Sequence, residues 1–162
     1  MKRMFLVFAI GLLWAWSLPG TALAAGADVY GVGGGKIAGG AASFSLSAHE
    51  GPNGDFGQVQ AKVPSEPLDV LTDVDCVNVF GMAGAGGAWI SSVVKKVNPD
   101  NLEGLAPGDP VLWVVNDGGS PSPPTPVDAI LGFFRVTANC KTLLPQFHPP
   151  NVTSGNISIK TG

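Results

Sequence analysis

Two groups of oxygen-bearing side chains are the residues of this sequence whose types and spacing suit metal or acid chemistry. In the first group, Asp73 and Asp75 flank a single valine, so on a strand both carboxylates leave the same face with Cβ atoms about 7 Å apart. Such a pair suits calcium coordination, or glycoside hydrolysis by two carboxyl groups. The alternative is a solvated strand edge or turn on which acidic side chains prevent pairing with other chains.

The second group follows the most apolar run of the chain. Asn116 and Asp117 precede two glycines, and Asp128 opens the next apolar run. An Asn-Asp-Gly-Gly segment predicts first of all a turn, because these residues tolerate left-handed backbone and bond to their own main chain. With Asp128 returning nearby, the alternative is an oxygen-rich cation site, although no 12-residue EF-hand loop is present. Calcium is therefore the one cofactor that the sequence leaves open.

Aromatic residues offer a third chemistry, the stacking of sugar rings. Trp113 lies inside an apolar run and is expected in the core, whereas Trp89 follows a glycine-rich segment and is the better candidate for an exposed ring. Tyr30 is the second candidate. Trp89 and Tyr30 are therefore the predicted stacking residues.

Most catalytic schemes lack their residues in this chain. The two histidines, His49 and His148, lie in Gly- or Pro-containing segments, and neither G-x-S-x-G nor H-E-x-x-H occurs. The glycine-rich segment 31–37 has no Ser or Thr after Lys36, so it does not predict a phosphate-binding loop. The sequence favours a non-enzymatic protein.

Cys76 and Cys140 are the only cysteines. An even pair in an exported chain predicts a disulfide, and two cysteines without nearby histidines are too few ligands for a metal. The alternative is two separate buried thiols.

Composition and periodicity indicate the elements that position these residues. The 23 glycines and 14 prolines argue against a helical bundle, while 45% hydrophobic residues can form a core. Alternating or apolar runs separated by turn residues predict strands over 29–37, 42–48, 58–63, 68–71, 74–80, 88–97, 111–115, 129–136 and 156–160. Glycines 33–35 indicate a bulge or an edge in the first run, and 111–115, apolar on both faces, is expected to be the most central strand. About eight strands predict an all-β, two-sheet antiparallel β-sandwich or jelly-roll-like fold.

The N-terminus is typical of a secretory signal peptide. Lys2 and Arg3 precede an apolar run, a Pro-Gly break and the segment Ala22-Leu23-Ala24, so we expect residues 1–24 to be removed and 25–162 to form a single β-sandwich domain. Removal lowers the basic residues from nine to seven against twelve acidic ones, a net charge of −5. Nucleic acid and anionic membrane surfaces are therefore not expected partners, and the domain is expected outside the cell or in its envelope.

Several of these segments together resemble a loose set of uncharacterised exported bacterial proteins with one β-sandwich-like domain. They are the glycine-rich run before 42–46, the strand around Cys76, the 114–118 strand end, Asp128 and the closing 155–159. The resemblance implies no activity. The leading hypothesis is an exported structural or binding domain of unknown ligand, whose partner is a cell-surface polymer or a protein. The alternative is a carbohydrate- or calcium-binding module, and a small secreted hydrolase with paired carboxylates has the least support.

Overall fold

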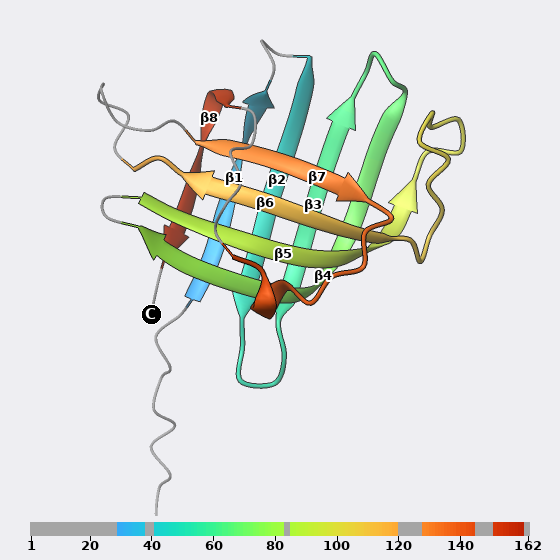
Figure 1. Cartoon of the computed structure of the whole chain (residues 1–162). Helices are drawn as coiled ribbons and strands as arrows, with labels where there is room; N and C mark the ends of the chain where they lie inside the picture. Colours follow the sequence, from blue (N-terminus) through green and yellow to red (C-terminus); the bar gives the residue numbers. More distant parts are fainter. Residues whose placement is uncertain (1–28, 38–40, 83–84, 120–127, 145–150, 161–162) are drawn as a thin grey trace, which may run out of the picture.

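Eight antiparallel strands form one sheet in this protein (Figure 1). The computed structural model describes residues 29–37, 41–82, 85–119, 128–144 and 151–160. The sheet order is β7-β6-β5-β4-β3-β2-β1-β8. The strands are β1 (Val29–Ile37), β2 (Ala42–Glu50), β3 (Phe56–Val63), β4 (Leu68–Met82), β5 (Ala85–Val97), β6 (Pro110–Asp117), β7 (Ala129–Phe134) and β8 (Val152–Lys160). The expected signal peptide lies outside the described residues.

The all-β class and the number of strands are confirmed, but the strands belong to a single curled sheet. In Figure 1, β8, β1, β2 and β3 run across the direction of β5, β6 and β7, so the sheet folds over on itself as a half-barrel. Bulges bend strands in this way and let one sheet turn a corner. A second sheet is not seen in the described part of the chain.

Strand β4 provides this bend. The sequence predicted two strands, 68–71 and 74–80, whereas the structure has one continuous strand with register shifts opposite β5. One shift lies between Val74 and Cys76, and it leaves Asp75 without a partner in the β4–β5 pairing. The extra residue reverses which side chains point inward, so Thr72 and Val74 are buried before the bulge and Val77 after it.

The structure decides two expectations about strand positions. For β1 the sequence indicated a bulge or an edge: the strand is not an edge, because β2 pairs with one side of it and β8 with the other, but a register irregularity does occur between Lys36 and Ile37 in the β8 pairing. Strand β6 is not central, since only β7 lies beyond it. It is nevertheless buried on both faces, because each face of the sheet carries an apolar cluster at this point.

The inner cluster is the main core. Strand β2 shows the pattern, with Phe44, Leu46 and Ala48 buried inside the curl and the intervening serines outside. Alternation with a period of two places every second side chain on the concave face. Inward residues of all eight strands meet there.

The outer cluster lies on the convex face and is covered by the chain itself. Trp89, Leu112, Val114 and Cys140 are its buried members, and Leu143 packs against them. The disulfide between Cys76 and Cys140 is confirmed and attaches the short 3-10 helix η2 (Cys140–Thr142) to β4, with Cα atoms 6.1 Å apart. Lys141 adds ion pairs to Glu50 and Asp55 at 2.7 and 3.3 Å. Among the described residues there is no helix with the length and apolarity to cross a membrane.

Candidate ligand cavity

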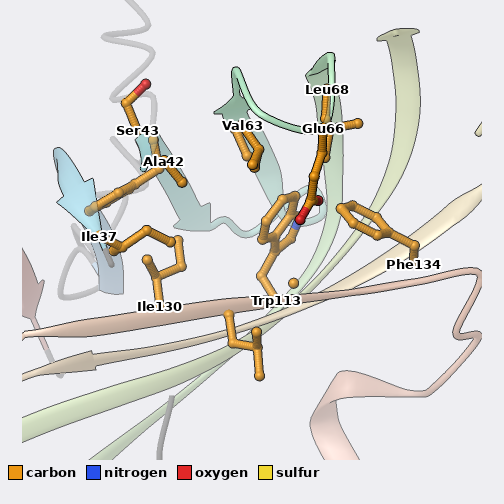
Figure 2. A pocket seen from close by; sticks show the side chains of 13 residues that line it. Ile37, Ala42, Ser43, Val63, Glu66, Leu68, Trp113, Ile130 and Phe134 are labelled. Carbon is orange, nitrogen blue, oxygen red and sulfur yellow. The ribbon is translucent and has the colours of Figure 1, made fainter. Parts of the chain in front are cut away.

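An apolar cavity of about 150 Å³ lies between the facing parts of the curled sheet (Figure 2). One wall comes from β1 to β4 and the other from β6 and β7. Aliphatic side chains dominate the lining, among them Ile37, Ala42, Val63, Leu68 and Ile130. Two aromatic rings, Trp113 and Phe134, complete it, and Glu66 supplies a side-chain polar group. These are the properties of a site for a small apolar ligand.

The indole of Trp113 is fixed inside this cavity by the sheet around it. Its Nε1 donates a hydrogen bond to Ser92 Oγ at 2.9 Å, and that hydroxyl donates to the Val111 carbonyl at 3.2 Å. The Phe134 ring meets the indole edge to face, with centroids 6.2 Å apart. Because Trp113 has no remaining donor and little freedom, it presents a rigid aromatic surface.

Gly132 makes room for this indole. It is the direct cross-strand partner of Trp113, and a Cβ added there would lie 2.5 Å from Trp113 Cζ3. No side chain fits at that distance. The glycine lets the indole lie flat over β7.

Phe134 is held in place by the turn that ends β7. Arg135 has a left-handed backbone with φ of 58°, and its amide donates to the Pro110 carbonyl at 2.7 Å. Its guanidinium bonds to the Gly104 carbonyl and lies 3.3 Å from Asp109 Oδ2. The Ala106 amide, and after it Arg135, hold the pKa of Asp109 below its usual range. This network keeps Arg135 outside and Phe134 inside the curl.

Glu66 lies in the turn between β3 and β4. Its amide donates to the Val63 carbonyl at 3.0 Å, which closes a turn over 63–66 with Pro64 at the second position. Proline suits that position because its φ is already fixed, and Pro67 restricts Glu66 to extended backbone. Figure 2 shows the Glu66 side chain pointing from this turn toward Trp113 and Phe134.

The predicted cation residues fall into two separate places. Asp73 lies on the outer face of β4, where its Oδ1 accepts hydrogen bonds from Gln58 Nε2 and Lys95 Nζ at 3.0 and 3.1 Å. The Gln58 bond, and after it Lys95, lower the pKa of Asp73. Asp75 is exposed in the bulge. Neither carboxylate lines the cavity.

Asp117 and Asp128 do come together, but their oxygens accept backbone amides. Asp128 accepts from Gly118 at 3.0 Å and from Ile157 at 2.5 Å. Asp117 accepts from Gly119 at 2.7 Å and from Ile159 at 2.8 Å. Both carboxylates therefore tie β8 to the ends of β6 and β7, and Asn116 precedes them as the penultimate residue of β6.

The two acidic groups are too far apart to act as one site. Asp73 pairs with Val93, Val93 pairs with Pro110, and Asp117 lies seven residues further along β6, a separation of about 23 Å. A glycosidase pair needs about 5–10 Å. In the described ranges no three His, Cys, Asp or Glu side chains are grouped in a way that could hold a metal ion.

The predicted stacking residues also lie apart. Trp89 is only 6% exposed and its Nε1 donates to the Leu144 carbonyl at 3.1 Å, so the expectation of an exposed ring was wrong. The covering segment 138–144 comes from a distant part of the chain. Tyr30 is half-buried on the outer face of β1, between His49, at 5.8 Å from centroid to centroid, and Lys160. Tyr30 and Trp89 lie on β1 and β5, and three strands stand between these two in the sheet order.

The cavity residues Glu66, Gly132 and Phe134 were not predicted as a group from the sequence. A signal was present in Gly132, an isolated glycine in an apolar strand, which indicates close approach of another group.

A scan against protein-family models and searches of curated proteins and of solved structures find no match to this chain. Geometry and chemistry are therefore the basis for assigning the cavity a role.

Proposed function

We propose that this protein is an exported, non-enzymatic binding domain that takes a small apolar ligand into the cavity inside its curled sheet. The observation that carries the proposal is the 150 Å³ apolar cavity with the fixed Trp113 ring in its wall. A dry cavity of about this size accepts one six-membered ring. The ligand, or the part of it that enters, is therefore of that size.

Export is supported by two features. The N-terminal residues have the charge, apolar run and small-residue site of a signal peptide. The Cys76–Cys140 disulfide suits an oxidising compartment. The resemblance to exported bacterial proteins agrees with the same localisation.

The other functions have weaker support from the geometry. A calcium site at Asp117 and Asp128 would compete with four backbone amides for the same oxygens. A sugar-stacking site would need Trp89, which the chain covers. A hydrolase based on Asp73 and Asp75 would need both carboxylates in a substrate cleft, and neither of them lines the cavity.

The test is a titration of the purified protein with toluene, followed by NMR. Trp89 and Trp113 serve as opposite reporters, because Trp113 lines the cavity and Trp89 lies on the other face. We expect the indole N–H signal of Trp113 to shift with saturation and that of Trp89 to stay unchanged. Equal small shifts at both, or none at Trp113, would contradict the proposal.

A matched pair of variants locates the binding. Ala61→Leu adds bulk inside the cavity, and Ser45→Leu adds the same side chain on the outer face of the neighbouring strand. We expect the Ala61 variant to lose the saturable shift and the Ser45 variant to keep it. Loss in both variants would count against the cavity as the site.

A further inference from the structure

We infer that the ligand of this cavity carries a positive charge next to its apolar body, and that the Glu66 carboxylate pairs with that charge. The inference rests on the proposed function, and it names the class of ligand: a small organic ammonium compound. Three independent features of the cavity lead to it.

The first feature is the charge of the lining. Glu66 is the one charged residue among those that line the cavity in the described part of the chain. The remaining lining residues are apolar apart from Ser43. An anionic ligand would meet a carboxylate and no cation, whereas an ammonium group would meet a partner of opposite charge.

The second feature is that the carboxylate is not neutralised by its neighbours. Within the described ranges, no side-chain hydrogen bond or ion pair engages Glu66. The lysine of the same hairpin, Lys62, instead pairs with Asp69 at 2.9 Å on the outer face. The turn between Pro64 and Pro67 nevertheless fixes the backbone of Glu66, so the side chain is positioned but unpaired.

The third feature is the aromatic lining next to the carboxylate. The Glu66 side chain points toward Trp113 and Phe134 (Figure 2). An ammonium group is attracted to the face of such rings, most strongly to an indole. A carboxylate with two aromatic rings thus favours an organic cation over a neutral ligand of the same shape.

The simplest other interpretation is that Glu66 is only a solvated turn residue. Its side chain is exposed, as glutamates on turns usually are. If Glu66 is only a solvated residue, neutral and charged ligands of the same shape should bind with the same affinity. The experiment therefore compares ligands that differ in charge and little else.

The purified protein is titrated with benzylammonium and with benzyl alcohol, with the Trp113 indole N–H as reporter. We expect benzylammonium to bind about three- to tenfold more tightly than the alcohol, the combined size of an exposed ion pair and a cation–π contact. In Glu66→Gln the ratio falls to about one, because the shape is kept and the charge is lost. Glu103→Gln, an exposed glutamate outside the cavity, is the matched control and retains the wild-type ratio.

The outcomes separate this inference from the proposed function. If benzyl alcohol binds in the cavity and benzylammonium binds no more tightly, the ammonium inference is wrong and the apolar site remains. If Glu66→Gln keeps the preference, or Glu103→Gln loses it equally, Glu66 is not the partner and the inference is overturned. If neither compound shifts Trp113, the proposed function fails and the inference fails with it.

Discussion

Both faces of this sheet carry an apolar surface, but the chain covers the outer one and leaves a cavity at the inner one. Among the described residues each face carries one tryptophan, Trp113 inside and Trp89 outside, on neighbouring strands β6 and β5. Each indole N–H has an acceptor, a buried hydroxyl for Trp113 and a backbone carbonyl for Trp89. The difference is what lies over the ring: a segment of the same chain on the outside, and an open cavity on the inside.

This difference separates stability from binding. The outer surface is covered by residues 138–144, which the disulfide and Lys141 hold to the sheet, so a ligand would have to displace the chain. The inner surface has the same kind of side chains, but its cavity is lined by two aromatic rings and by the Glu66 carboxylate, which makes no side-chain hydrogen bond or ion pair within the described residues. Apolar area that the fold covers contributes to stability, and area that it leaves open is available to a ligand.

The largest expected effect is on the covered face. Replacing both cysteines, Cys76→Ala with Cys140→Ala, removes the crosslink and loosens the cover over Trp89. The bond closes a loop of 64 residues in sequence separation, which the chain-entropy model values at about 4 kcal/mol. We expect the free energy of unfolding in urea to fall by about that amount, with the Trp89 fluorescence shifting toward that of an exposed ring.

The same double variant also tests whether the two faces are independent. Toluene should still shift Trp113, because the cavity contacts neither cysteine. A loss of less than about 1 kcal/mol would show that the cover does not depend on the crosslink. Loss of toluene binding in a folded variant would show that the two faces are coupled.

The next largest effect is expected at Asp117 and Asp128, whose carboxylates bind backbone amides of β8. Asp128→Ala leaves the Gly118 and Ile157 amides without their acceptor, and we expect a loss of about 3 kcal/mol. Hydrogen exchange at the Ile157 amide should accelerate, because this residue is 1% exposed and depends on that bond. Asp128→Asn keeps one carbonyl acceptor and should lose less. Unchanged exchange in the alanine variant would contradict the assignment of Asp128 to β8.

A smaller effect is expected from glycines that make room for aromatic rings, one on each face. Gly132 faces Trp113 inside, and Gly87 faces the Phe80 ring outside, in both cases as direct cross-strand partners. Alanine at either position forces the ring to move, at a cost of about 2 kcal/mol. Only Gly132→Ala should also weaken toluene binding, since only it moves a cavity wall. Equal weakening in both variants would contradict the separation of the faces.

Strand positions could be predicted because burial with a period of two leaves a direct mark on the sequence. The single sheet could not, because a bulge changes the phase of that pattern. The buried positions are even up to Val74, whereas Val77 is buried after the bulge and Val79 is partly buried. The predicted break, between Leu71 and Val74, lies instead beside the first register shift. Only the pairing with β5 shows one strand that bends.

The site residues escaped prediction for a related reason. The Cys76–Cys140 pair could be predicted from the sequence. The burial of Trp89 could not, because it depends on where residues 138–144 lie in space. Asp128 looked like a cation ligand because its partner amide, on Ile157, is 29 residues away. Glu66 was not predicted as a site residue, because only the curl of the sheet brings it to the same cavity as Trp113 and Phe134.

The smallest expected effect is the response of the outer face to acid. Hydrogen bonding from Lys62 and Gln60 lowers the pKa of Asp69, against the opposing effect of burial, and Gln58 and Lys95 lower that of Asp73. A carboxyl whose pKa is lower in the folded state stabilises the fold above its unfolded pKa, about 3.9, and that stability is lost as the pH falls through the folded pKa. We therefore expect the melting temperature to decline modestly below about pH 4. Gln58→Ala should lower the melting temperature at pH 7 and have a smaller effect at pH 2, because protonation of Asp73 on acidification weakens the bond that its carboxylate accepts from Gln58. Toluene binding to either protein at pH 7 should be equal, because Gln58 and Asp73 lie on the face that the ligand does not enter. A Gln58 effect of the same size at both pH values would mean that the amide acts by packing and not through the carboxylate of Asp73.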